Sequence, residues 1–468
     1  MSAETTPQRL LRNSKEYANE PAISIPVNGG WETETWAEFT SYVMDISKSL
    51  VALGFQHSDK LSIYSYNRKE WYGCYAAAQM AGGAGVGVYH TCSPEEVEWV
   101  VGNSDSKVVF VGNNPMDNGE TDKMPNHRLM KVLDRLEKVE HVVMMNGVDV
   151  LENPRAMTWD DFIGKGSSVD ESQVMDRENA LTMEDTASLI YTSGTTGNPK
   201  GVELTHDNWS FELDATDSIM EFQQGEKYVS WLPLAHVFGQ LVDNHYWIKN
   251  ALHMYVVDNP LNVVDFAKEI QPHLFIGVPR IYEKIYSNVK AALDAKAVLK
   301  ILLKVPGISG VLQGKLKEKI GMANCRFAIT GAAPINTDIL RLFQSLGVPI
   351  FEGYGMTEDT AGATINYAGM NRIGTVGPAF PNTEIKIAED GEVLIKGRHV
   401  MKGYYKNPEA TAETIIDGWL YSGDVGEVDA DGFVRITGRK KEIYVTSGGK
   451  NIAPLVVEET MKSISIIS

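Results

Sequence analysis

Residues 191–201 read YTSGTTGNPKG and directly follow an apolar segment. The run contains four hydroxyl residues, three glycines and one lysine: Thr192, Ser193, Thr195, Thr196, Gly194, Gly197, Gly201 and Lys200. Glycine lets backbone amides approach an anion closely, while hydroxyls and a lysine add hydrogen bonds and positive charge. The spacing differs from the P-loop pattern GxxxxGK[ST], but it predicts a polyphosphate-binding loop rather than a flexible surface turn.

Short β-branched or aromatic runs surround this loop and alternate with amphipathic helical patterns. They cover residues 61–67, 85–90, 107–113, 141–147, 188–194, 227–233, 273–279 and 325–331. Nearly continuous apolar strands separated by helices predict an α/β fold with parallel or mixed sheets flanked by helices. Ligands of such sheets bind beyond the carboxyl ends of the strands, where several of these runs end in glycine or polar residues.

The pattern changes after about Glu352, where short strands and turns replace the helical periodicity. Asp-Gly pairs at residues 390–391, 417–418 and 431–432 are typical hairpin turns. We therefore expect a small antiparallel β-unit beside the α/β body.

Composition excludes several classes of protein. The net charge of −18 argues against binding to nucleic acid. Three widely spaced cysteines without a CxxC pair indicate neither a disulfide framework nor a zinc site, which favours a reducing compartment. The N-terminus lacks the apolar run of a signal peptide, and no segment is long and apolar enough to span a bilayer, so we expect a cytoplasmic protein.

The loop at 191–201 resembles the signature of the AMP-forming synthetases, which include acyl-CoA synthetases, luciferases and peptide-synthetase adenylation domains. Further segments match in the order of that family. Gly331-Ala332-Ala333-Pro334 is similar to the loop that lines the adenine pocket. Tyr354-Gly355-Met356-Thr357-Glu358 is similar to the YGxTE element. The resemblance implies that Tyr354 stacks on adenine, Thr357 contacts phosphate and Glu358 holds Mg²⁺.

Two later segments narrow the resemblance. Residues 417–424 (DGWLYSGD) and 438–442 (GRKKE) resemble the fatty acyl-CoA synthetase signature, with Ser422 where threonine is usual. The resemblance implies that Asp424 binds the ribose hydroxyls and that Arg439 lies near ribose or phosphate. Residues 233–239 (PLAHVFG) resemble the acyl-pocket segment, which implies that His236 borders the substrate carboxylate. Residues 447–451 (SGGKN) resemble the loop that shapes the pantetheine tunnel.

The implied reaction is ATP-dependent activation of a long-chain fatty acid through acyl-AMP to acyl-CoA, with Mg²⁺ as cofactor and CoA as cosubstrate. Lys200, Thr357, Glu358 and His236 are the expected catalytic residues. Two alternatives remain open: a fatty acyl-AMP ligase, and a non-catalytic module that binds acyl nucleotides. Neither the acyl chain length nor the oligomeric state can be read from the sequence.

The resemblance also implies a domain organisation. Residues 1–440 would form the AMP-binding domain, with α/β subdomains at 1–180 and 181–350 and a β-rich subdomain at 351–440. Residues 441–468 would form the hinge, at Lys441, and the beginning of an incomplete C-terminal α+β domain. The family uses a second lysine from that domain during adenylation, and Lys462 lies too close to the hinge to supply it. We therefore expect low activity from this chain alone.

Residues Lys296–Lys319 contain six lysines and one acid interleaved with apolar residues. This pattern suits an interfacial amphipathic helix that docks on anionic lipid, and it equally suits a solvated helix packed on the body. We expect peripheral membrane contact through this segment.

Overall fold

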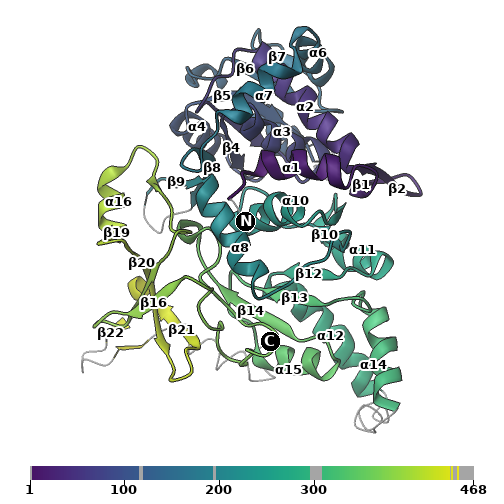
Figure 1. Cartoon of the computed structure of the whole chain (residues 1–468), viewed down its shortest axis with the longest axis vertical. Helices are drawn as coiled ribbons and strands as arrows, with labels where there is room; N and C mark the ends of the chain where they lie inside the picture. The colour runs from purple at the N-terminus through teal and green to yellow at the C-terminus, as the bar shows by residue number, and fades with distance from the viewer. Residues whose placement is uncertain are drawn as a thin grey trace.

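The computed structural model describes residues 3–114, 120–192, 197–295, 308–442, 444–445 and 451–452. Two eight-stranded sheets form the body, and a five-stranded antiparallel sheet lies beside them (Figure 1). Both large sheets are mixed and flanked by helices. The predicted fold class is confirmed for the two mixed sheets and the antiparallel unit, whereas most of residues 441–468 lies outside the described residues.

The first sheet has a parallel centre and antiparallel strands at one edge. Its strands, in spatial order, are β18 (Gly403–Tyr404), β9 (Lys200–Thr205), β8 (Thr186–Thr192), β4 (Ala84–Val88), β3 (Lys60–Tyr64), β5 (Ser106–Val111), β6 (His141–Met144) and β7 (Ala156–Thr158). The edge strand β18 comes from far along the chain, and Gly403 pairs with Glu203.

The second sheet is also parallel except at its two edges. Its strands, in spatial order, are β15 (Thr364–Ile365), β14 (Ile350–Tyr354), β13 (Phe327–Thr330), β12 (Leu274–Gly277), β10 (Lys227–Ser230), β11 (His253–Val256), β1 (Pro21–Val27) and β2 (Gly30–Thr35). Strands β8 and β9 belong to the first sheet, and β1 and β2 belong to the second. The sheets thus exchange strands across the expected limit at residue 180, and the division into domains stays a prediction.

The third sheet consists of β16 (Glu384–Ile387), β17 (Glu392–Lys396), β20 (Trp419–Val428), β19 (Ile415–Ile416) and β21 (Val434–Arg439). The predicted Asp-Gly turn joins β19 to β20, because Ile416 pairs with Trp419. Asp417 and Gly418 both have positive φ, 52° and 77°, as a two-residue hairpin turn requires.

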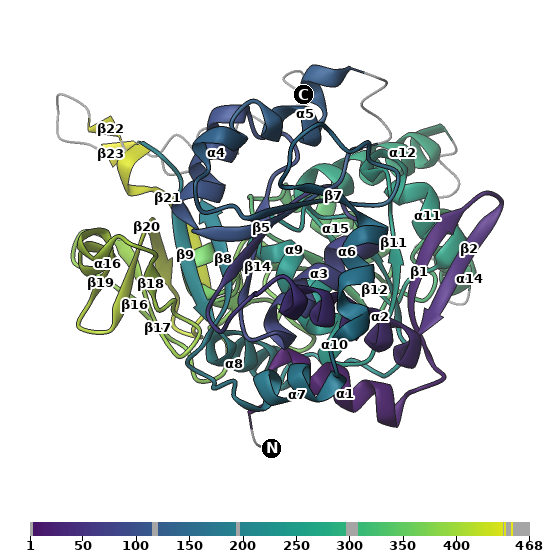
Figure 2. The same ribbon diagram turned by 90° about the horizontal axis from the view of Figure 1, so that it is seen from above.

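Helices form three layers around the two large sheets (Figure 2). The layer between the sheets contains α1 (Thr6–Glu16), α2 (Trp36–Ala52), α3 (Lys69–Met80), α8 (His206–Asp217), α9 (Val237–Gln240), the π-helical segment η5 (Leu241–Tyr246) and α10 (Trp247–Lys249). Outer layers contain α4 (Pro94–Asn103) and α5 (Pro125–Met130) on the first sheet, and α11 (Val263–Ile270), α12 (Pro279–Ala295) and α15 (Thr337–Ser345) on the second. The remaining helices are α6 (Trp159–Lys165), α7 (Glu171–Asn179), α14 (Ile308–Lys319) and α16 (Pro408–Thr414).

The main core lies between the two large sheets and is rich in large aromatic side chains. Trp247 is fully buried and packs against Phe39 and Trp36, at ring-centroid distances of 4.8 and 5.2 Å. Burying one such ring stabilises the fold by about 2–3 kcal/mol. Of the inner helical segments, α8, α9 and η5 also border the cavity described below.

Two sequence predictions concern the surface. The segment 296–307 of the expected lipid-binding helix lies outside the described residues. In α14, Leu316 packs against the core of the second sheet, whereas Val311 is 64% exposed. Peripheral membrane contact stays a prediction. Over the described ranges, no helix is both long and apolar enough to cross a bilayer.

Candidate active site

A cavity of about 1120 Å³ opens where the three sheets meet. Its walls include the carboxyl ends of β8, β12, β13 and β14, the inner faces of α8 and η5, and residues of β18, β20 and β21. The carboxyl ends of parallel strands are the usual binding edge of an α/β sheet. The cavity is therefore the candidate active site.

The two ends of the expected phosphate loop are fixed in the first sheet. Thr192 pairs with Lys200 across the β8–β9 ladder, and the Trp99 indole donates to the Pro199 carbonyl at 2.8 Å. Thr192 and Lys200 both line the cavity. Ser193, Gly194, Thr195 and Thr196 lie outside the described residues; Gly197 is exposed, with φ of 99°. The loop thus begins and ends at the cavity wall.

Lys200 and Glu358 both contact the same tyrosine, Tyr404. The Lys200 Nζ lies 3.9 Å from the centre of the Tyr404 ring, and the Tyr404 hydroxyl donates to Glu358 Oε1 at 2.7 Å. Tyr404 occupies β18, which pairs with β9, so the ladder brings Tyr404 close to Lys200 at the start of β9. Burial, with the Glu358 carboxylate nearby, raises the pKa of Tyr404, so the hydroxyl keeps its proton. The arrangement places a cation and a carboxylate in one cavity wall.

A second cluster of polar side chains lies at the third sheet. The Tyr354 hydroxyl donates to Asp424 Oδ2 at 2.7 Å, and Arg439 Nε lies 3.3 Å from Asp424 Oδ1. Asp424 and Arg439 are register partners on β20 and β21. Burial raises the pKa of Asp424 above its ordinary value, against the lowering effects of the Tyr354 hydrogen bond and the Arg439 charge. Tyr354 and Arg439 line the cavity.

The glycine-rich turns after β13 and β14 leave space beside these groups. Gly331 and Ala332 line the cavity, and Ala332 has a left-handed φ of 67°. Ala333 is exposed and is not part of the lining. At Gly355 a Cβ atom would lie 2.2 Å from the Ala361 carbonyl oxygen, so only glycine fits. Thr357 is buried and lines the same wall.

His236 caps the start of α9 and lines the cavity, whose apolar lining residues form what we call the apolar arm. Its Nδ1 accepts a hydrogen bond from the Phe238 amide at 3.2 Å and caps α9. Burial lowers the pKa of His236, which keeps the ring neutral at physiological pH. The arm beyond is lined by Phe222, Leu241, Val242, Leu274, Ile276, Ile329, Ile365 and Phe380. A neutral ring therefore stands beside a hydrocarbon-like surface.

The profile of the AMP-binding enzyme family matches residues 10–405. The chain belongs to this family. A long-chain-fatty-acid–CoA ligase of Mycobacterium bovis, FadD15, is 33% identical over 94% of this chain and 75% of its own length. The human long-chain-fatty-acid–CoA ligase ACSBG2 is 31% identical over 99% of this chain and 74% of its own length.

Solved structures show the same fold. The anthranilate–CoA ligase AuaEII, in complex with anthranoyl-AMP, has a TM-score of 0.79 at 19% identity. The comparison covers 99% of this chain and 83% of AuaEII. ATP-bound MatB from Rhodopseudomonas palustris has a TM-score of 0.76 at 23% identity, over 99% of this chain and 84% of MatB.

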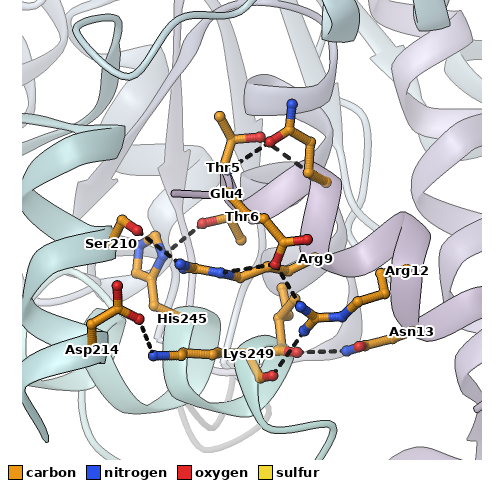
Figure 3. A network of polar contacts seen from close by, with 12 residues as sticks. Glu4, Thr5, Thr6, Arg9, Arg12, Asn13, Ser210, Asp214, His245 and Lys249 are labelled. Carbon is orange, nitrogen blue, oxygen red and sulfur yellow. Dashed lines mark hydrogen bonds and ion pairs between the residues drawn. The ribbon is translucent and has the colours of Figure 1, made fainter. Parts of the chain in front are cut away.

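In this AMP-binding enzyme, a polar network supports the cavity from outside (Figure 3). Arg9 of α1 donates to the Ser210 hydroxyl of α8 at 2.9 Å, and Thr6 is 2.9 Å from Nδ1 of His245 in η5. Lys249 forms an ion pair with Asp214 at 2.5 Å. The network joins α1 to the two helices whose opposite faces line the cavity.

The helix α8 begins at a capping box that fixes its position. The Thr205 hydroxyl accepts from the Asn208 amide at 3.2 Å, and the Asn208 side chain accepts from the Thr205 amide at 2.8 Å. This exchange satisfies two backbone donors at the helix start. Glu212 and Thr216, one turn apart on α8, consequently face the cavity.

Sequence reasoning missed several residues of this AMP-binding enzyme's cavity. Tyr404 was not predicted, because its place in the cavity wall depends on the pairing of β18 with β9. Glu212 and Tyr246 also line the cavity, and no motif contains them. The sequence does offer one indication for Glu212. It is a charged residue among the large apolar residues Trp209, Phe211 and Leu213, and a charged residue in a buried helix often has a functional role.

Proposed function

We propose that the protein activates long-chain fatty acids with ATP and transfers the acyl group to CoA. A single observation carries the proposal: one cavity combines a phosphate-loop lysine and buried carboxylates with an apolar arm. The lysine and the carboxylates suit a nucleotide, and the apolar arm suits a hydrocarbon chain. The long-chain-fatty-acid–CoA ligases from M. bovis and human support this substrate class.

The reaction proceeds in two displacements. The fatty acid carboxylate attacks the α-phosphorus of ATP, which releases pyrophosphate and forms acyl-AMP. The CoA thiolate then attacks the acyl carbon and displaces AMP. The protein contributes alignment and charge compensation rather than a covalent intermediate.

Lys200 is the cation that compensates charge developing on the phosphates. Its ammonium lies over the Tyr404 ring, whose hydroxyl is held by Glu358. The cation–π contact and the hydrogen bond restrict both side chains before substrate arrives, so little reorganisation is needed during reaction. Thr357, in the same wall, supplies a hydroxyl for a phosphate oxygen.

Glu358 is the residue that would hold a magnesium ion, which would supply positive charge beside the substrate phosphates. Mg²⁺ prefers oxygen ligands and is held by one or two carboxylates together with substrate phosphates. Across the described ranges, no group of three or more His, Cys, Asp or Glu side chains forms a protein-only metal site. The Glu358 carboxylate, which lines the cavity, fits this mode of magnesium binding, and the bound ion would neutralise phosphate charge.

The nucleoside and the acyl carboxylate would bind on either side of the phosphates. Tyr354 offers its ring to adenine, beside the space left by Gly331 and Ala332. Asp424, oriented by Tyr354 and Arg439, accepts hydrogen bonds from the ribose hydroxyls. His236 borders the fatty acid carboxylate at the entrance to the apolar arm.

The test is product analysis with the 468-residue chain, ATP, Mg²⁺, CoA and saturated acids of increasing length. We expect acyl-AMP and acyl-CoA by mass spectrometry, with little of either from Lys200→Ala. The rate also measures the low turnover expected from the sequence. Acyl-AMP without acyl-CoA would instead support a fatty acyl-AMP ligase, and bound ATP without product would support a non-catalytic binding module.

A further inference from the structure

Three polar groups in the cavity wall have no hydrogen-bond partner among the described residues. They are both carboxyl oxygens of Glu212, the hydroxyl of Tyr246 and the hydroxyl of Thr330. The three residues are 1%, 5% and 0% exposed. A buried polar group without a partner costs about 1–3 kcal/mol, so such groups usually mark a site for a ligand or water.

Two of these groups come from neighbouring helical segments and line the same cavity. Glu212 comes from α8 and Tyr246 from the last position of η5, and the two segments pack together, with Trp209 of α8 stacked on His245 of η5 at a ring-centroid distance of 4.0 Å. A Cβ atom at Gly362 would lie 2.3 Å from Glu212 Oε1, which shows that the glycine leaves room for the carboxyl. π-Helical segments such as η5 occur frequently at functional sites.

The outer network holds the residues next to these two groups. Ser210, two residues before Glu212, is held by Arg9, and His245, directly before Tyr246, is held by Thr6 (Figure 3). The Tyr75 hydroxyl lies 3.0 Å from the other ring nitrogen of His245. The orphaned atoms are therefore a built feature of the arm.

The protonation states of Glu212 and Tyr246 limit which chemical groups of a ligand can bind to them. Burial, and to a smaller extent the neighbouring Asp359, raises the pKa of Glu212 well above its ordinary value, which favours the protonated, neutral form of this carboxyl. Burial also raises the pKa of Tyr246. A neutral carboxyl and a phenol can each donate and accept. A ligand hydroxyl matches both, whereas an ammonium group would need a carboxylate and a plain hydrocarbon would satisfy neither.

We propose that the apolar arm binds a long-chain fatty acid carrying a hydroxyl group on its hydrocarbon chain, with that hydroxyl hydrogen-bonded to Glu212 and Tyr246. The inference rests on the proposed function and refines its substrate. The unsubstituted acid still fits the surrounding apolar wall, but it leaves two polar groups buried without partners.

The test compares hexadecanoic acid with a positional series of monohydroxylated hexadecanoic acids. Acyl-AMP and acyl-CoA are quantified for the wild type, Glu212→Leu, Tyr246→Phe and the matched control Glu212→Gln. For at least one hydroxyl position we expect kcat/KM about tenfold or more above that of the plain acid. Glu212→Leu should abolish or reverse this preference, Tyr246→Phe should reduce it, and Glu212→Gln should retain part of it.

A thermal-shift titration with the same acids provides a readout that does not depend on turnover. If no acid is adenylated, the proposed function fails, and the titration still decides the inference. A larger shift with one hydroxylated acid, lost in Glu212→Leu, supports it. If wild type responds equally to plain and hydroxylated acids at every position, or if Glu212→Leu leaves the ratio unchanged, the orphaned groups hold only water and the inference is wrong.

Discussion

The two ends of the cavity treat their buried polar groups differently. At the nucleotide end, Tyr354 is paired with Asp424, and Tyr404 is paired with Glu358. In the apolar arm, Glu212 and Tyr246 have no partner within the described part of the chain. Paired groups are oriented before substrate arrives, whereas groups without partners wait for one. The end that we propose binds the nucleotide thus has its polar groups oriented in advance, and the arm that we propose binds the acyl substrate retains hydrogen-bonding capacity.

The largest expected effect is at the nucleotide end, with Glu358→Gln. The amide keeps the shape and an acceptor for Tyr404 but loses the negative charge proposed to hold Mg²⁺. We expect adenylation to fall about a hundredfold or more, measured as pyrophosphate release. Glu409→Gln, an exposed acid on α16, is the control. Equal rates for both variants would show that Glu358 has a structural role only.

Asp424→Asn tests whether the paired carboxylate binds the nucleotide. Loss of charge-assisted hydrogen bonds should weaken ATP binding about thirtyfold by calorimetry. Because burial raises the pKa of Asp424, acidification should protonate it at a higher pH than an ordinary aspartate. As the pH falls, wild-type affinity should consequently begin to decrease at a higher pH than titration of an ordinary aspartate would cause, while the variant stays nearly flat. Parallel pH profiles would contradict the role of this carboxylate.

The free energy of unfolding of Glu212→Leu should show that the carboxyl in the apolar arm, unlike the paired groups at the other end of the cavity, has no partner. The raised pKa of Glu212 means that the folded chain retains a proton which the unfolded chain releases above about pH 4.5. Folding therefore loses stability as the pH rises through the folded-state pKa. The leucine variant lacks this loss, so we expect it to be about 1.5 kcal/mol more stable than wild type at pH 8, with a smaller gain at pH 5. A leucine variant less stable at pH 8 would indicate that the carboxyl has a partner.

The smallest effect is expected in the outer network. Thr6→Val keeps the size of the side chain but removes the hydrogen bond to His245. Chemical denaturation should show a loss of about 1 kcal/mol, with kcat changed less than about threefold. Thr5, the N-cap of the same helix, provides a comparison, because Thr5→Val should destabilise α1 similarly without touching η5. A selective loss of hydroxy-acid preference in Thr6→Val would reveal that the network also positions Tyr246.

The sequence predicted the repeating parts of the molecule and missed the parts that depend on long-range pairing. All eight expected apolar runs contain strands, because a strand buried on both faces is recognisable from its own residues. Lys200, Glu358 and Tyr354 lay in motifs and reach one cavity. Tyr404, Glu212 and Tyr246 could not be recognised, since their surroundings come from segments far away in the chain. The exchange of strands between the two large sheets was not predicted for the same reason.

The pairing of β18 with β9 also sets an order of events during synthesis. Gly403 and Glu203 are register partners 200 positions apart. At typical elongation rates of about 5–20 residues per second, β9 leaves the ribosome roughly 10–40 s before its neighbour exists. During this interval the first sheet presents an open edge, which is a common point of misassembly. Tyr404 lies in the strand that covers that edge and contacts both Lys200 and Glu358, so the wall that we propose binds ATP is completed only when the edge is covered.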